Sequence, residues 1–196
     1  SHGPFNKMLY ELAQGDLFRD IWGLPRFVPE ELTDHKRPIY RSAFFKTMED
    51  IEVVLRFFAL RHMQHYKSGV QGFLDLYMIR SKAFDQEDIA FLSSLFYSTL
   101  NCAYAIYQNH VFKVFEHGEW KGKASKGMYD AIMVPLSEFT LQFDELVNKR
   151  EEIIHRTIEI IQREGVSAIT GRASTKKDLE NRIDLFRNLF HVVLAS

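Results

Sequence analysis

Cysteine, glycine and proline are all scarce in this chain of 196 residues, and each scarcity excludes a class of protein. The single cysteine, Cys102, cannot form an internal disulfide, which argues against a disulfide-stabilised secreted domain and fits a reducing compartment. Its apolar neighbours predict a buried core thiol. With only 10 glycines and 5 prolines, the chain does not have the composition of a low-complexity or disordered segment.

An excess of either charge is also missing, since the chain has 25 basic and 26 acidic residues. No overall field therefore draws it to nucleic acid or to an anionic membrane, and binding of either kind would need a local patch. The N-terminal residues contain no basic segment followed by an apolar run. We therefore expect neither a secretion signal nor a transit peptide, and we expect a cytoplasmic protein.

Hydrophobic residues are abundant by contrast, at 46% of the chain, and 17 of them are phenylalanines. A chain of this length buries roughly 70% of its unfolded surface, so we expect a domain with a substantial core. One stretch without Asp, Glu, Lys or Arg, residues 89–110, is as long as a membrane span. Serine, asparagine and tyrosine residues are scattered around it, so we expect a buried helix and no membrane contact.

Apolar residues recur at helical spacing along the chain, and no segment alternates as a strand does. We therefore predict an all-α fold, a single multi-helix domain over residues 1–196 with orthogonal or bundle-like packing. Residues 1–46 are expected to form short helices and a proline-containing connecting arm, and residues 47–196 the helical core. The central buried helix is expected at about 85–115, with an acidic start at Asp85.

Two long helices are predicted in the C-terminal half, at about 139–164 and 175–196. The first repeats its apolar residues every seven positions, which predicts packing along its full length. It also carries three ion pairs at i,i+4 spacing: Glu145–Lys149, Glu152–Arg156 and Glu159–Arg163. The second has Thr175 as its N-cap.

Shorter helices are predicted earlier in the chain. One covers about 47–67, where Glu52 and Arg56 are expected to form an ion pair at the edge of the apolar face. Another covers about 126–134 after the N-cap Ser125, and the proline that follows is expected to begin the next element.

Basic residues gather in two places that could contact nucleic acid or phosphate. The first cluster lies beside Trp120 and the second at the start of the last helix: Lys121, Lys123 and Lys126, then Arg172, Lys176 and Lys177. Basic side chains neutralise phosphates and an aromatic ring can stack on a base, which predicts a nucleic-acid-binding patch. Acidic residues are interleaved with the second cluster, so an ordinary charged surface is the alternative.

Two histidines, His62 and His65, have the spacing of metal ligands on one side of a helix. His62 also falls on the apolar face, where a hydrogen-bonded core histidine is the alternative. Glu152 and His155 copy half of a di-iron bundle motif, but the second half is missing from the sequence. A metal-dependent enzyme is therefore an alternative function, although we expect no cofactor in this chain.

Other catalytic motifs stop short of completion. The segment 118–125 has the glycines and lysine of a phosphate-binding P-loop, but only three residues separate the glycines, and Ala124 stands where the motif has Ser or Thr. No Gly-x-Ser-x-Gly elbow occurs, and Cys102 has no basic neighbour. We therefore expect no catalytic residue here.

Two stretches are similar to a known family: residues 3–12 read GPFNKMLYEL, and residues 48–60 read MEDIEVVLRFFAL. They resemble the helical half of the GmrSD-type restriction endonuclease N-terminal-domain family. In that family a "GPF" helix and a D-x-E-x-V-L-R-F-x-A-L helix follow a ParB-like domain with a DGQQR nucleotide-handling motif. Residues 170–177 and 182–186 are similar to the family's closing helices, less specifically.

The resemblance implies a module that packs on, positions or regulates a nucleotide-handling domain in a DNA-defence protein. The chain contains no DGQQR motif and no His-Asn-His nuclease motif, so no catalytic residue of the family can be carried over onto it. We therefore expect a fragment or separately expressed module, with an upstream ParB-like domain as its partner and DNA as a second candidate partner. A nucleic-acid-binding module and a metal-dependent enzyme around His62 and His65 remain the alternatives.

Overall fold

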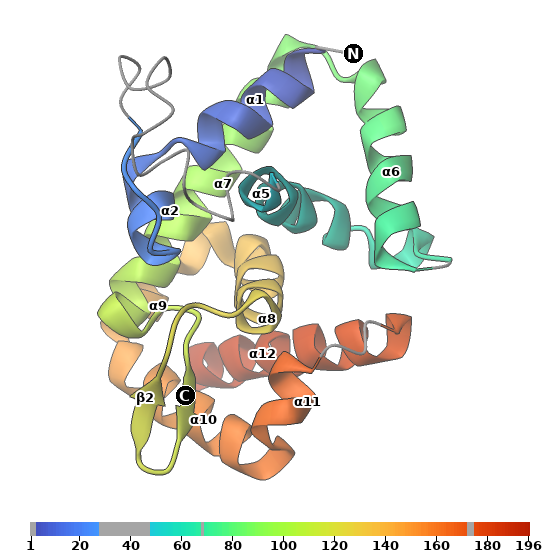
Figure 1. Ribbon diagram of the computed structural model, residues 1–196. Coiled ribbons are helices and arrows are strands. Elements are labelled where there is room, and N and C mark those ends of the chain that lie inside the picture. The colour runs from blue at the N-terminus through green and yellow to red at the C-terminus, as the bar shows by residue number, and fades with distance from the viewer. Residues whose placement is uncertain (1–2, 28–47, 68, 172–174) are drawn as a thin grey trace.

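The computed structural model describes residues 3–27, 48–67, 69–171 and 175–196, which form a multi-helix, all-α fold (Figure 1). The predicted fold class is therefore confirmed. Most of the connecting arm expected before residue 47 lies outside the described residues, as does Arg172.

The first half of the chain consists of helices joined by short 3₁₀ turns. The helices are α1 (Pro4–Ala13), α2 (Asp16–Ile21), α5 (Glu49–Leu60), α6 (Val70–Arg80) and α7 (Gln86–Tyr107). The turns are η2 (Met63–His65), η3 (Ser81–Ala83) and η4 (Gln108–His110).

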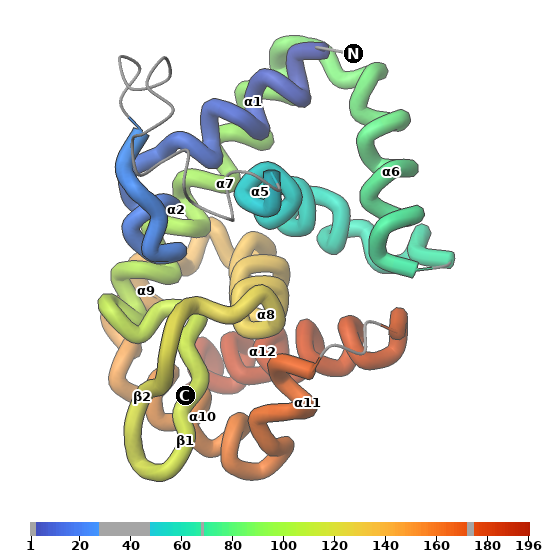
Figure 2. Tube along the Cα trace, in the orientation of Figure 1, coloured from blue at the N-terminus to red at the C-terminus, as the bar shows by residue number. Residues whose placement is uncertain are grey.

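The second half begins with a hairpin and continues as helices. Its elements are β1 (Val114–Glu116), β2 (Glu119–Lys121), α8 (Lys126–Leu136), η5 (Ser137–Gln142), α9 (Phe143–Asn148), α10 (Arg150–Glu164), α11 (Val166–Thr170) and α12 (Lys176–Ala195). Figure 2 shows α1, α2 and α6 in the upper part of the molecule and the hairpin, α10, α11 and α12 in the lower part, with α8 between them.

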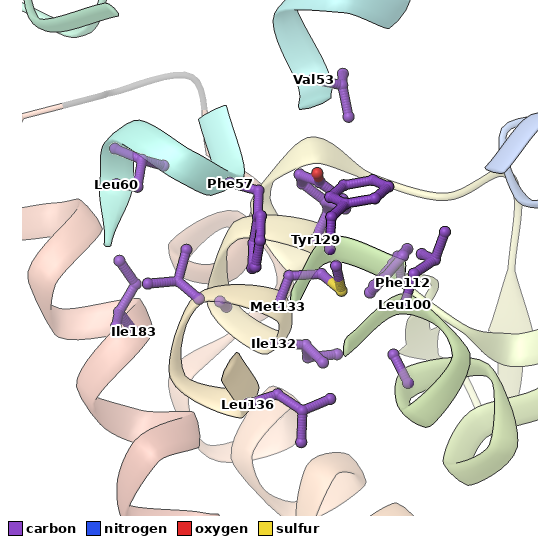
Figure 3. Close-up of a cluster of buried hydrophobic side chains, with 14 of the residues drawn as sticks. Val53, Phe57, Leu60, Leu100, Phe112, Tyr129, Ile132, Met133, Leu136 and Ile183 are labelled. Carbon is purple, nitrogen blue, oxygen red and sulfur yellow. The ribbon is translucent and has the colours of Figure 1, made fainter. Parts of the chain in front are cut away.

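Helix α8 lies at the centre of the core, and every residue from Gly127 to Leu136 is buried. It packs against α12, α5, α7 and α11. Figure 3 shows its inward side chains meeting those of the surrounding helices: Tyr129, Ile132, Met133 and Leu136 from α8, Phe57 and Leu60 from α5, Leu100 from α7 and Ile183 from α12. Burying each such side chain stabilises the fold by about 1.5–3 kcal/mol.

The prediction of a central buried helix at about 85–115 is wrong in two respects: only one side of α7 is buried, the buried central helix being α8, and α7 ends before residue 115. Its start is fixed by a capping box, in which Asp85 accepts from the Asp88 amide at 2.8 Å and Asp88 accepts from the Asp85 amide at 3.0 Å. Its end is at Tyr107, because Gln108 has a positive φ of 52° that an α-helix cannot continue.

The other two predicted N-caps are confirmed. Ser125 accepts from the amide of Met128 at 3.1 Å, and Thr175 accepts from the amide of Asp178 at 3.2 Å. Each cap satisfies an amide that has no partner within its helix, which is worth about 1 kcal/mol.

The long helix predicted at 139–164 is wrong in its continuity. Phe139 is a non-helical residue inside η5, and the backbone leaves helical geometry at Gln142, where η5 meets α9, and again at Lys149, between α9 and α10. Lys149 uses this break to donate to the carbonyl oxygens of Val193 and Ser196, at 3.0 and 2.9 Å, at the end of α12. A cation at that position also complements the negative end of the α12 dipole.

Two of the three predicted i,i+4 ion pairs are confirmed, at 3.5 Å for Lys149–Glu145 and 3.0 Å for Arg156–Glu152. The third predicted pair, Glu159–Arg163, does not form. Glu159 instead lies 3.7 Å from the ring of His155, and Arg163 contacts its neighbour Glu164. All are exposed or half-exposed pairs of the kind that contribute little to stability.

Two helix ends were also mispredicted. Helix α5 ends at Leu60 rather than near residue 67, because the chain folds back and packs Tyr66 on Phe73 of α6, with ring centroids 5.2 Å apart. Pro135 lies inside the last turn of α8 instead of beginning the next element. A proline near a helix end removes one hydrogen bond, a loss that the dense packing around α8 offsets.

The hairpin contradicts the expectation that no segment forms a strand. β1 and β2 pair antiparallel, with Phe115 opposite Trp120. Their two-residue turn, His117 and Gly118, has positive φ at both positions, 53° and 82°. A tight turn of this kind usually carries Asn-Gly or Asp-Gly, and the His-Gly sequence does not give that signal.

Candidate functional site

The solvent-facing side of α7 carries no Asp, Glu, Lys or Arg after Asp88. We term it the α7 outer face and define it by its exposed residues: Ala90, Phe91, Ser94, Tyr97, Ser98 and Asn101. Phe91 is 62% exposed and Tyr97 43%, so two aromatic rings lie on this face. Small residues at 90, 94 and 98 recur every four positions and would let a partner's backbone approach closely.

The segment Gln86–His110 is also long and apolar enough to cross a membrane, by length and composition alone. Under half of its most apolar window, 44%, is buried within the molecule. The core helix of a soluble protein passes the same test, so the observation describes the surface of α7 without identifying its surroundings.

The first basic cluster lies on the hairpin and at the start of α8, where carboxylates accompany two of its lysines. Lys121 pairs with Glu119 on the same strand, and the ammonium of Lys126 lies 3.6 Å from the carboxylate of Glu49. Lys123 is exposed in the loop between β2 and α8. The cluster is therefore a mixed-charge surface.

Trp120, expected as a stacking platform, is already stacked within the protein. Its ring lies 5.1 Å from the ring of His110, with only 10° between the planes, and makes an edge contact with Phe115 at 5.3 Å. The ring of His110 already covers one face of the indole. The geometry therefore does not favour nucleic-acid recognition at Trp120.

The second basic cluster, at the start of α12, is similarly mixed. The ammonium of Lys176 lies 3.8 Å from Glu180, and Lys177 is exposed. Arg182, further along α12, is buried and donates to the carbonyl oxygens of Ala168 and Gly171, at 2.9 and 3.0 Å. It joins the end of α11 to α12 and is not part of a phosphate-binding surface.

Arg56 does not form the predicted surface pair with Glu52. It is buried on α5, and its Nε and Nη2 donate to the two carboxylate oxygens of Asp130 on α8, with Nε at 3.1 Å from Oδ1. Burial raises the pKa of the Asp130 carboxyl, and the charge of Arg56 opposes that shift. The pair joins α5 to α8 within the core.

Asp50, the first residue of the D-x-E-x-V-L-R-F-x-A-L segment, also forms a buried ion pair. Asp50 is buried at the start of α5, with its carboxylate 3.6 Å from Nη1 of Arg19. Arg19 also donates to the carbonyl oxygens of Ala13, at 3.1 Å, and Pro25. The Asp and Arg of the D-x-E-x-V-L-R-F-x-A-L segment therefore fix α5 to its neighbours in the fold.

A cavity of about 260 Å³, the α6 pocket, lies where η2 meets α6 and η3. Four of its lining residues are apolar or aromatic and three are basic or imidazole side chains: Phe73, Leu76, Tyr77 and Phe84, with His62, His65 and Arg80. His62 stacks on Tyr77 with ring centroids 5.8 Å apart. Burial, reinforced by the charges of Arg61, His65 and Arg80, lowers the pKa of His62.

The two histidines thus share one pocket, but their surroundings do not resemble a metal centre. Among the described residues, no three His, Cys, Asp or Glu side chains are placed to hold a metal ion. Arg61 and Arg80 also add positive charge beside His62, which opposes a cation.

Cys102 is buried as predicted, facing a shallow groove between α7 and α9. Burial, with a smaller contribution from Asp144, raises the pKa of its thiol to about 12. The thiolate, which is the nucleophilic form, is therefore almost absent at neutral pH.

Comparison of the chain with protein-family models, with curated proteins and with solved structures found no match.

Sequence reasoning found only part of the α6 pocket. The spacing of His62 and His65 singled them out, whereas Arg80 and Phe84 come from a later helix and turn. Apolar residues also occur on the solvent side of α6, where Leu76 and Ile79 are 36% and 62% exposed.

Proposed function

We propose that this chain is a non-catalytic helical module that packs on, and thereby positions or regulates, a nucleotide-handling domain of a DNA-defence protein. The nature of the partner comes from the resemblance of residues 3–12 and 48–60 to the GmrSD-type family. The observation that carries the docking role is the α7 outer face, an uncharged helix surface with Phe91 62% exposed.

The α7 outer face has the composition of a protein-binding surface. Exposed aromatic side chains on a monomer favour a partner that buries them, and the core of a protein interface is depleted in charge. The small residues Ala90, Ser94 and Ser98 lie along the same face. A helix or sheet of the partner with an equally uncharged surface would therefore fit against α7.

The test is binding between this chain and a DGQQR-containing domain encoded beside it, measured by titration calorimetry. Replacement of Phe91 by Asp should weaken binding at least about tenfold, because it places a charge in the interface core. Ile79→Asp is the matched control, since Ile79 is also 62% exposed but belongs to α6. Equal losses in both variants, or no loss in either, would contradict docking through α7.

Two further measurements distinguish this proposal from a catalytic role and from binding to a second copy or a membrane. Nucleotide hydrolysis by the isolated chain would contradict a non-catalytic role. Self-association that Phe91→Asp abolishes would show that the α7 outer face binds a second copy of the chain. Flotation with lipid vesicles that Phe91→Asp abolishes would show that it binds a membrane. Either result would overturn the proposed partner.

A further inference from the structure

The α6 pocket is distinct from the α7 outer face, and ring side chains account for most of its lining. Phe73 and Tyr77 of α6, Phe84 after η3 and His62 before η2 all line it. The aliphatic side chain of Leu76, 36% exposed, lies in the same lining. The lining surface is almost wholly apolar. Its chemistry therefore matches an uncharged apolar molecule rather than an ion.

The aromatic walls of the pocket are held in place by further rings behind them. Tyr77 and Phe84 each contact the buried ring of Phe5 on α1, with ring centroids 5.7 and 5.5 Å apart. Phe73 packs against the buried ring of Tyr66, at 5.2 Å. Closing the walls on the cavity would break these contacts. The pocket is therefore formed before a ligand enters, which lowers the cost of binding.

The histidines and the arginine of the lining leave its apolar character unchanged. Burial lowers the pKa of His62, so its imidazole is uncharged at neutral pH. The ring stacks on Tyr77, with centroids 5.8 Å apart, and so acts as a further flat wall. His65 and Arg80 are exposed, and such side chains can cover an apolar surface with their carbon atoms while the polar end stays in water.

The size of the pocket limits what it can hold. At about 260 Å³ it lies just below the common range of ligand pockets, about 300–1,000 Å³. A ligand the size of one or two fused rings would fit, whereas a nucleotide would extend well beyond the lining. An unfilled apolar cavity costs stability because its lining atoms lack contacts, and a ring of this size would supply them.

We propose that the α6 pocket binds a small neutral aromatic molecule of one or two fused rings, packed among Phe73, Tyr77 and Phe84. Such a molecule makes offset and edge contacts with the aromatic walls. A charged group on the same ring system would lose its hydration without gaining a partner in the lining. This site is independent of docking through α7.

The experiment uses 2-naphthol as the probe and NMR of the intact chain as the readout. Saturable shifts of the ring signals of His62, Phe73 and Tyr77 are expected at ligand concentrations below about 1 mM. The ring of His155, exposed on α10, should not respond. The charged analogues 2-naphthoate and 2-naphthylmethylammonium should bind at least about tenfold more weakly, because each brings a charge into an apolar lining.

Substitutions then locate the site. Leu76→Trp adds an indole to the lining and should abolish binding of 2-naphthol, with folding verified by circular dichroism. Ile79→Trp is the matched control, because it adds the same ring to α6 at a residue that is 62% exposed and outside the lining. Phe84→Leu removes one aromatic wall while keeping an apolar side chain, and should weaken binding about threefold or more.

Three outcomes would overturn the proposal. They are the absence of saturable 2-naphthol binding up to about 1 mM, binding of either charged analogue as tight as that of 2-naphthol, and equal losses with Leu76→Trp and Ile79→Trp.

Discussion

Arg56 and Asp130 are 74 residues apart in the sequence and form a bidentate ion pair in the core, joining α5 to α8. Both side chains are almost completely buried. The pair is therefore one of the few specific polar links within a core that is otherwise held by apolar contacts, and it sets how α5 lies against the central helix.

Removing one partner should be far more harmful than removing both. Asp130→Ala leaves the Arg56 guanidinium buried without its carboxylate and should lower the free energy of unfolding by about 3–5 kcal/mol. The double variant Arg56→Met, Asp130→Leu should lose much less than the sum of the single changes, because no uncompensated charge remains. Urea denaturation of the unsubstituted protein, Asp130→Ala, Arg56→Met, Asp130→Leu and the double variant measures the difference. Additive losses would show that the two groups do not depend on each other.

Gly127 should not tolerate a methyl group, because a Cβ there would lie 3.0 Å from the Cα of Thr170 and closer still to the carbonyl oxygen of Ile169. Both neighbours are backbone atoms, so α11 would have to move. Gly127→Ala should therefore lower stability by about 1–3 kcal/mol.

Gly72 is the control for this prediction, since it lies in α6 and an added Cβ would meet no atom within 4 Å. Gly72→Ala should raise stability by about 0.5–1 kcal/mol, because alanine loses less backbone entropy in a helix. Thermal unfolding of both variants tests the pair. Equal losses in Gly72→Ala and Gly127→Ala would contradict the prediction, because close packing against α11 would then not explain the loss at Gly127.

The features that could be predicted from the sequence are those set by local interactions. The N-caps Ser125 and Thr175 and the ion pairs at Lys149 and Arg156 depend on residues three or four positions away. The partner of Arg56 could not be predicted, because the i,i+4 rule offers Glu52 while burial makes Asp130 the better partner. Local pattern alone cannot decide between them.

The candidate sites likewise depend on contacts between residues that are far apart in the sequence. The lysines were found from their spacing in sequence, but the carboxylates that accompany Lys121 and Lys126 and the ring that covers Trp120 required the fold. Likewise, His62 and His65 were proposed as metal ligands, and only the fold places Arg80 in the same pocket.

The basic clusters yield a prediction about DNA. Since Glu49, Glu119 and Glu180 accompany their lysines, we expect the isolated chain to bind duplex DNA only weakly at physiological salt. Replacing Lys121, Lys123, Lys176 and Lys177 by Glu should then change little. Fluorescence anisotropy across a salt series is the measurement. Strong binding that falls steeply with salt and disappears in the fourfold variant would instead support the nucleic-acid-binding alternative.

Cys102 should make the protein less stable at high pH. Burial raises the pKa of its thiol to about 12, whereas the thiol of an unfolded chain has a pKa of about 8.5. Below the lower value the thiol is protonated in both states. Between the two values the unfolded chain releases a proton that the folded protein keeps, so the free energy of unfolding falls by about 1.4 kcal/mol per pH unit. Cys102→Ala should remove that part of the slope. Urea denaturation from about pH 8 to pH 11 compares the two proteins, and parallel pH profiles would show that the thiol is not shielded as the structure indicates.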